Sequence, residues 1–174
     1  AIGLYAERSV TRELRLHHQE RLNELAFQMR YRLDRSMFER FRDVLTASSL
    51  ETLRTGSTSA RREVLERLQE TYPHYAWIGL TDARGRVRAA TNGWLEGESV
   101  AERPWFVGGL TGPFVGDVHE AQVLARFLPA GPEGAWLVDI SAPVRGRDGA
   151  AVGVLGAHLN WTWAEEVLGS IVRA

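Results

Sequence analysis

The sequence predicts an α+β domain in which a five-stranded antiparallel sheet packs on a long N-terminal helix. Residues 4–45 contain no proline or glycine and place apolar side chains at helical steps of three and four. Residues 75–161, in contrast, form short extended runs separated by turns that contain glycine. Because five antiparallel strands cannot bury both faces alone, one face should lie on the long helix.

The first helix is expected over residues 1–48. One line of its apolar residues is Leu22, Leu25, Met29, Leu33, Met37, Phe41 and Val44. A second line beside it is Phe27, Tyr31, Phe38 and Leu45. Two interpretations stay open: both lines pack within one subunit, or the second line meets a partner helix.

A second helix is expected over residues 57–72, where a serine or threonine near Ser59 can cap its start and Pro73 stops it. The sheet should then occupy residues 75–161. Its first two strands flank "DARG", where Gly85 can take the positive φ of a tight hairpin.

The rest of the sheet region begins with a short helix in "SVAERPWFVGGL" and a strand in "GPFVGDVH". Two longer strands, "AWLVDISAPV" and "AAVGVLGAHLNW", are joined at "RGRDG". An exit helix over residues 162–174 ends the chain. No internal repeat is present, so residues 1–174 are expected to form a single domain with one core.

Composition excludes several classes of protein. The 174 residues carry 21 basic and 22 acidic side chains, so no overall field attracts nucleic acid or an anionic membrane. There is no cysteine, which excludes disulfides, thiolate metal sites and thiol nucleophiles. No apolar run is long enough to span a bilayer. The chain starts without methionine and ends in a helical pattern, so we expect a piece of a longer protein.

Three stretches, "YAWIGLTDARGRV", "ERPWF" and "VDISAPVRGRDGAAVGVLGAHL", resemble the Cache domains, also called PDC or extracellular PAS-like domains. The resemblance covers about residues 1–170 and one module. It implies a PAS-like sheet with a pocket and a ligand-sensing ectodomain of a bacterial chemoreceptor, sensor histidine kinase or diguanylate cyclase. It also implies a periplasmic location, flanking transmembrane helices that tether a soluble domain, and a homodimer in the full receptor.

In amino-acid-binding members of this family, an Arg-x-Trp pair holds the ligand carboxylate, and the matching residues here are Arg103 and Trp105. A guanidinium can donate two parallel hydrogen bonds to a carboxylate, and an indole N–H adds a third. The alternative is that Arg103 forms a surface salt bridge and Trp105 is a core residue.

The chain departs from the family pattern at two places. The aspartate that binds the ligand's ammonium is replaced by His158 in "GAHL", and a neutral histidine does not supply a fixed negative charge. The Tyr-x-Asp pair is replaced by Val118 and Glu120. Ordinary α-amino acids are therefore expected to bind weakly or not at all.

A negative group for the pocket could come from Asp139, which shares one strand face with Leu137 and Ser141. That face is either the pocket or the solvent side. His119 is expected either at the polar rim of the pocket or in a hydrogen-bonded turn at the end of its strand, and Trp94 is either a lid or a packing residue. The complete predicted ligand-binding set is Trp77, Trp94, Arg103, Trp105, Phe106, His119, Glu120, Asp139, Ser141 and His158. No metal and no cofactor are expected, because no pair shows the spacing of a zinc site.

The resulting function is a non-catalytic sensor of a small molecule with an anionic or strongly polar group. An enzyme is disfavoured because the chain has no G-x-S-x-G elbow, phosphate-binding loop or spaced carboxylate pair. A ligand-free dimerisation module remains the alternative. Ligand screening separates it from a sensor, because a bound ligand stabilises the native state.

Overall fold

The structure is a computed structural model that describes residues 2–128 and 135–172. Its contacts divide the chain into two compact units. One consists of Ala1–Met37 together with Ala164–Ala174, and the other of Phe38–Trp163. Within the described residues no helix is long and apolar enough to cross a membrane.

The α-helices follow the predicted order, with one addition, and two short 3₁₀ helices, Thr91–Gly93 and Leu124–Arg126, lie in the loops. The α-helices are α1 Ile2–Ser48, α2 Glu51–Thr55, α3 Thr58–Thr71, α4 Pro104–Thr111 and α5 Thr162–Val172. The short helix α2 lies where the sequence suggested only a break. Ser57 caps α3, because its Oγ accepts a hydrogen bond of 3.2 Å from the backbone N–H of Ala60. The capping residue is thus a serine two positions before Ser59.

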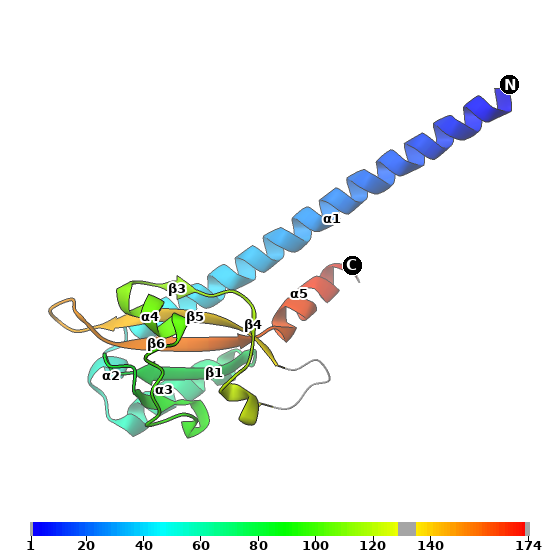
Figure 1. The fold of residues 1–174 in the computed structure, drawn as a ribbon. Coiled ribbons are helices and arrows are strands. Elements are labelled where there is room, and N and C mark those ends of the chain that lie inside the picture. Colours follow the sequence, from blue (N-terminus) through cyan, green and yellow to red (C-terminus); the bar gives the residue numbers. More distant parts are fainter. Residues whose placement is uncertain (1, 129–134, 173–174) are drawn as a thin grey trace. The chain divides into compact units, whose positions relative to one another are not determined.

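The sheet is antiparallel throughout, and Figure 1 shows its strands side by side. Its strands are β1 Tyr75–Thr81, β2 Val87–Ala90, β3 Phe114–Val115, β4 His119–Glu120, β5 Trp136–Arg145 and β6 Ala151–Asn160. The spatial order is β2-β1-β6-β5-β3, and β4 also pairs with β5. The five predicted positions are therefore present. The strand predicted in "GPFVGDVH" is, however, two strands of two residues each.

Turn chemistry explains the two tight hairpins. Gly85 has a φ of 79° between β1 and β2, and Gly149 has a φ of 82° between β5 and β6. A residue with a Cβ rarely adopts this conformation, which accounts for glycine at both turns.

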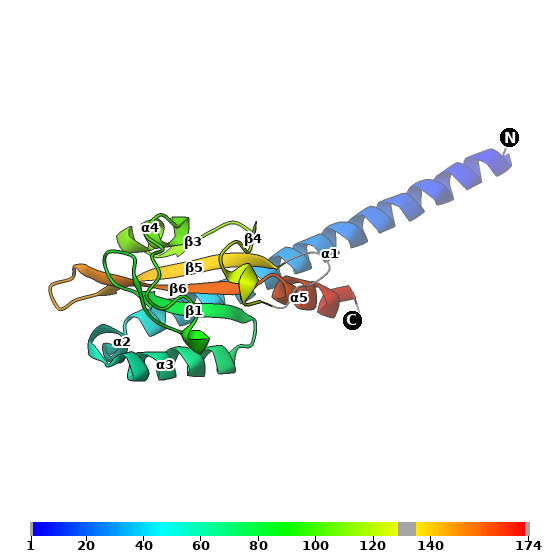
Figure 2. The ribbon, with the colours of Figure 1, turned by 60° about the horizontal axis from the view of Figure 1, so that its bottom comes forward.

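Helices cover both faces of the sheet. Figure 2 shows α4 beside β3 and α3 beside β1. α4 contacts β5 and β6, while α3 contacts β1 and β2. The end of α1, from Phe38 on, belongs to the same compact unit as the sheet. Val44 and Ala47 are buried there, and the Tyr75 hydroxyl donates to the Arg40 carbonyl at 3.4 Å.

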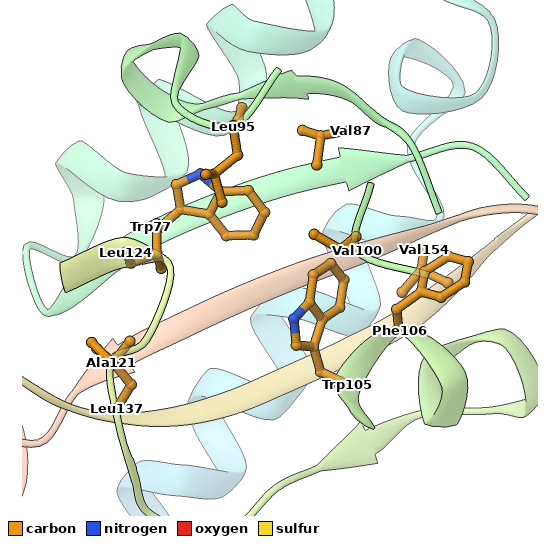
Figure 3. Packing of buried hydrophobic residues seen from close by; sticks show 11 residues of the cluster. Trp77, Val87, Leu95, Val100, Trp105, Phe106, Ala121, Leu124, Leu137 and Val154 are labelled. Carbon is orange, nitrogen blue, oxygen red and sulfur yellow. The ribbon is translucent and has the colours of Figure 1, made fainter. Parts of the chain in front are cut away.

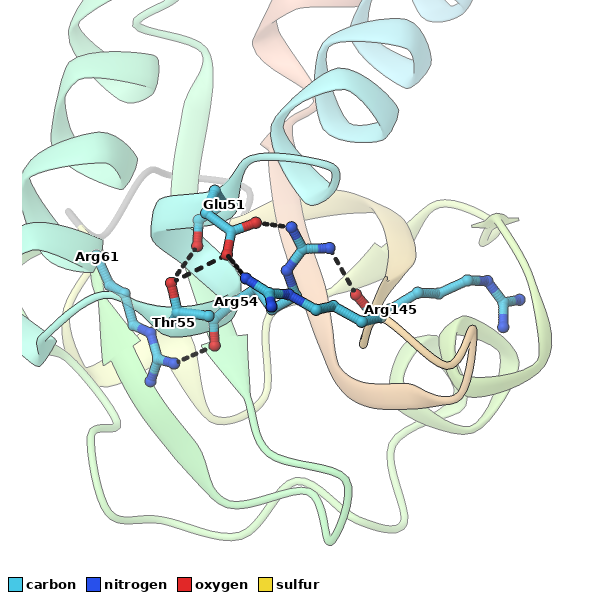
Figure 4. A network of polar contacts seen from close by, with 6 residues as sticks. Glu51, Arg54, Thr55, Arg61 and Arg145 are labelled. Atoms are coloured by element: carbon cyan, nitrogen blue, oxygen red, sulfur yellow. Dashed lines mark hydrogen bonds and ion pairs between the residues drawn. The ribbon is translucent and has the colours of Figure 1, made fainter.

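A polar network connects α2 with the turn that joins β5 and β6 (Figure 4). Arg54 forms an ion pair with Glu51 and donates to the Arg145 carbonyl at 3.4 Å, and Arg61 donates to the Arg54 carbonyl at 2.8 Å. The bond from Arg61 satisfies one of the last carbonyl groups of α2, and the bond from Arg54 ties this short helix to the end of β5.

The loop after β2 is tied to α3 by a bidentate ion pair. Arg62 donates to Glu96 at 3.0 and 2.6 Å, and Glu96 also accepts from the backbone N–H of Ala90 at 3.0 Å. Burial acts to raise the pKa of Glu96, but the hydrogen bonds from Arg62 and Ala90 outweigh it, so the pKa lies below its usual value of 4.5.

We expect Glu96→Gln to make the free energy of unfolding less dependent on acid pH. The pKa of Glu96 is lower in the folded state than in the unfolded chain. The carboxylate therefore stabilises the fold at pH values above about 4.5, and this stabilisation is lost as the pH falls through the pKa of the folded state. Urea unfolding at pH 7 and at pH 3 measures the difference. Glu63→Gln on α3, which removes an exposed carboxylate, is the charge control. If the pH dependence of unfolding is the same in Glu96→Gln as in the wild type, the pKa of Glu96 is not lowered in the folded state.

Candidate functional site

One face of the central sheet carries the residues from which a site is built. Alternate positions of a strand share a face, and the register pairs Trp77 with His158 and His158 with Asp139. Ser141 lies two residues after Asp139 and pairs with Gly156. The predicted face of β5 therefore continues across β6 to β1.

Two glycines make room on this face for two indole rings. A Cβ on Gly79 would lie 2.2 Å from the Trp77 ring, and one on Gly156 would lie 2.5 Å from the Trp105 ring. These glycines are register partners on β1 and β6. The tryptophans can therefore lie against the sheet, with their ring centroids 6.0 Å apart in an edge-to-face arrangement.

Helix α4 delivers Arg103 and Trp105 to the sheet. Pro104 occupies the first turn, where its missing N–H costs nothing, and Arg103 precedes it in extended conformation. The Ser141 hydroxyl donates to the Trp105 carbonyl at 2.6 Å, which fixes the start of the helix on β5. Figure 3 shows Trp105 and Phe106 at the start of α4, and Trp77 on β1.

A cavity of about 170 Å³ lies between this face and two loops. Its lining residues are Leu95, Val100, Arg103, Pro104, Trp105, His119, Ala121, Gln122, Val123, Leu124, Leu137 and His158. Most of this surface is apolar. The polar contributions come from one arginine, one glutamine and two histidines.

Arg103 is half-buried at this cavity, and its Nη1 donates to the Gln122 Oε1 at 2.8 Å. Within the described part of the chain no carboxylate forms an ion pair with Arg103. Its remaining N–H groups are thus available to an anion. Of the two parts of the alternative, no salt bridge of Arg103 is found among the described residues, whereas Trp105 is buried in the core.

Asp139 lies between two histidines. Its Oδ1 contacts the Nδ1 of His158, and its Oδ2 lies 3.4 Å from the Nε2 of His119. Asp139 and His158 are both buried, and neither faces the solvent side of the sheet. His119 Nδ1 lies 2.9 Å from the Leu137 carbonyl, which can only accept, so this nitrogen carries a hydrogen.

The two loops over the cavity are joined to each other by side chains. Trp94 stacks on Phe127 with ring centroids 5.0 Å apart, and Glu98 forms an ion pair with Arg126. The Trp94 carbonyl accepts a hydrogen bond of 3.2 Å from the Trp77 indole. Trp94 therefore joins the two loops, and its ring does not line the cavity.

The predicted set divides into three groups. Four residues line the cavity: Arg103, Trp105, His119 and His158. Five support the cavity from behind or beside it, namely Trp77, Trp94, Phe106, Asp139 and Ser141. Glu120 is exposed on β4 and is not brought to the cavity, because side chains alternate along a strand and His119 takes the inward position.

Sequence reasoning missed Gln122 and the apolar wall. Leu95, Val100 and Leu124 come from loops whose spacing has no period, so nothing in the sequence placed them beside Trp105. Gln122 follows a two-residue strand, which is too short to give an alternation pattern. Within the described residues, no group of three or more His, Asp or Glu side chains is arranged to hold a metal ion.

No family model and no curated protein matches the sequence. Solved structures do match. The ligand-binding domain of the Pseudomonas fluorescens chemoreceptor CtaA, in complex with L-valine, has a TM-score of 0.62 at 16% identity. The V. cholerae histidine kinase DctB sensor domain has a TM-score of 0.62 at 17% identity. The ligand-binding domain of the Pseudomonas aeruginosa PAO1 amino acid chemoreceptor PctC, in complex with GABA, has a TM-score of 0.58 at 18% identity.

These alignments cover 80%, 87% and 83% of this chain, but only 60%, 58% and 62% of the three structures. The chain thus spans about three fifths of their length, consistent with one module. At this identity the comparison shows the fold, which is that of the Cache sensor domains. The resemblance stated from the sequence is confirmed at that level.

Proposed function

We propose that the chain is the extracytoplasmic sensing domain of a transmembrane signalling receptor, and that it binds a small molecule with an anionic group without catalysing a reaction. One observation carries the proposal. A half-buried guanidinium without a carboxylate partner among the described residues stands at a mainly apolar cavity beside the central sheet. A guanidinium in this position can bind an anion through charge-assisted hydrogen bonds.

The chemistry of the cavity favours binding over catalysis. Its lining residues include no serine, threonine, cysteine or lysine that could act as a nucleophile. Asp139 and the two histidines instead form contacts with one another. L-Valine and GABA, the ligands named for two structures of the same fold, both carry a carboxylate.

A thermal-shift screen of small carboxylates, amines and uncharged compounds tests the proposal. A ligand at 100 times its dissociation constant stabilises the native state by about 2.7 kcal/mol, which raises the Tm by several degrees for a domain of this size. We expect hits among the carboxylates. If no compound raises the Tm, the alternative of a ligand-free dimerisation module is favoured.

The tethered receptor is proposed to be a homodimer held by flanking membrane helices, with contacts along α1. Phe27, Tyr31 and Phe38 are 69%, 57% and 58% exposed, so the second apolar line is not covered within one subunit at these positions. Exposed aromatic residues at helical spacing favour a partner. A ligand would signal only if it binds two arrangements of the dimer with different affinities.

We expect the isolated chain to dimerise weakly, and Tyr31→Glu to weaken the dimer about tenfold or more, since a charge would replace an apolar contact. Sedimentation over a wide concentration range measures both. Ala26→Glu adds the same charge to an exposed position on another side of α1 and should have a smaller effect. A wild-type chain that stays monomeric up to millimolar concentration would contradict the proposal.

A further inference from the structure

The free polar atoms of the cavity have a defined chemistry. The Nδ1 of His158 faces the Asp139 carboxylate, which can only accept, so this nitrogen carries a hydrogen. When the ring carries only this hydrogen, the Nε2 of His158 presents a lone pair. No described residue donates a hydrogen bond to it, while the ring lines the cavity. In this form of His158 the cavity combines the guanidinium of Arg103 with a hydrogen-bond acceptor.

The cavity has no free carboxylate for a ligand's ammonium group. None of its lining residues is acidic, and the Oδ1 and Oδ2 of Asp139 lie against His158 and His119. The Oε1 of Gln122 accepts from Arg103, and Glu120 is exposed elsewhere on β4. An ammonium would thus lose its water beside a guanidinium of the same charge, which costs free energy unless a counter-charge is present.

Size and lining restrict the rest of the ligand. The cavity of about 170 Å³ is close to the 150 Å³ of a protein cavity that holds benzene. Apart from Arg103, Gln122 and the two histidines, its wall consists of aliphatic side chains, Pro104 and the Trp105 ring. A second charged group would have no partner there, so the body of the ligand should be apolar and compact.

From these three features we propose that the cavity takes a small monocarboxylate that carries a hydroxyl group and an apolar body. Arg103 binds the carboxylate, and the hydroxyl donates its hydrogen to the Nε2 of His158. Asp139 acts as a positioning residue, because it fixes the hydrogen on the Nδ1 of His158. This proposal rests on the proposed sensing function and names the chemical class of the molecule sensed.

Three probes with one carbon skeleton test the proposal by calorimetry with the whole chain. They are 2-hydroxy-3-methylbutanoate, 3-methylbutanoate and L-valine, which differ only in carrying a hydroxyl, a hydrogen or an ammonium at C2. We expect the hydroxy acid to bind most tightly, the other two about tenfold or more weakly. Valine binding as tightly as the hydroxy acid overturns the proposal, and so does an unchanged affinity after loss of the hydroxyl.

A second measurement avoids variants that leave Asp139 unpaired. The imidazole ¹⁵N signal of the His158 Nε2 should shift when the hydroxy acid binds, and should shift much less with 3-methylbutanoate. The ring signals of His158 are distinguished from those of the other four histidines by through-bond correlation with its own assigned backbone. If neither probe moves the signal, the hydroxyl contact is refuted.

The outcomes also separate this proposal from the sensing function. If an amine or an uncharged compound from the wider screen binds the cavity more tightly than every carboxylate, the domain is a sensor but the ligand class is wrong. If the three probes and the whole screen leave the Tm unchanged, both proposals fail.

Discussion

Arg103→Ala is expected to reduce the affinity for the best carboxylate of the screen by about ten- to a hundredfold while the Tm of the free domain changes little. The loss follows from removing a charge-assisted contact, which contributes about 1.5–3 kcal/mol. The small effect on folding follows from the contacts of Arg103, since its side chain is half-buried and bonded to a single glutamine. Calorimetry with wild type and variant measures the affinity ratio.

The matched control is Arg84→Ala, which removes the same charge from an exposed position in the turn between β1 and β2. It should leave the affinity within about twofold, because exposed charges are largely screened at physiological salt. In Gln122→Ala the guanidinium stays but loses its hydrogen bond to the glutamine, so the affinity should fall between those of Arg103→Ala and the wild type. Equal affinity in Arg103→Ala and wild type would show that the cavity does not bind its anion through this residue.

The sequence predicted most of the helices and strands well, because their positions depend on local signals. Apolar period, serine caps and positive-φ glycines act within a few residues, and α1, α3, β5 and β6 formed where these signals stood. The exception is "GPFVGDVH", where the chain pairs with β5 twice and leaves it in between. A run of eight residues with glycine and proline does not show where such a strand is interrupted.

The site was predictable only where strand alternation or the family motif applied. Asp139, Ser141 and His158 fall on one face because period two applies to long strands, and Arg103 and Trp105 came from the motif. The pairing of His158 with Asp139 needed the register of β5 against β6, which one sequence does not give. That pairing matters most for the proposed function, because it places the predicted acid against a histidine that lines the cavity.

The position of Trp105 depends on a missing side chain, and Gly156→Ala is expected to lower stability by about 1–3 kcal/mol. The added Cβ would lie 2.5 Å from the Trp105 ring, so the indole or the strand must move. Overpacking a close-packed core has this typical cost. Because Trp105 lines the cavity and contacts the Trp77 ring, its displacement should also weaken ligand binding and alter the near-ultraviolet circular dichroism of the two indoles.

Gly112→Ala is the control that separates this contact from the general effect of replacing glycine. Gly112 ends α4 with an extended backbone at a φ of −176°, and an added Cβ there meets nothing within 4 Å. The same substitution should therefore be neutral or slightly stabilising, since it restricts the unfolded chain without strain in the folded one. Thermal unfolding of both variants decides the matter. If Gly156→Ala and Gly112→Ala melt together, the indole does not lie against β6, and the cavity that it lines has a different shape.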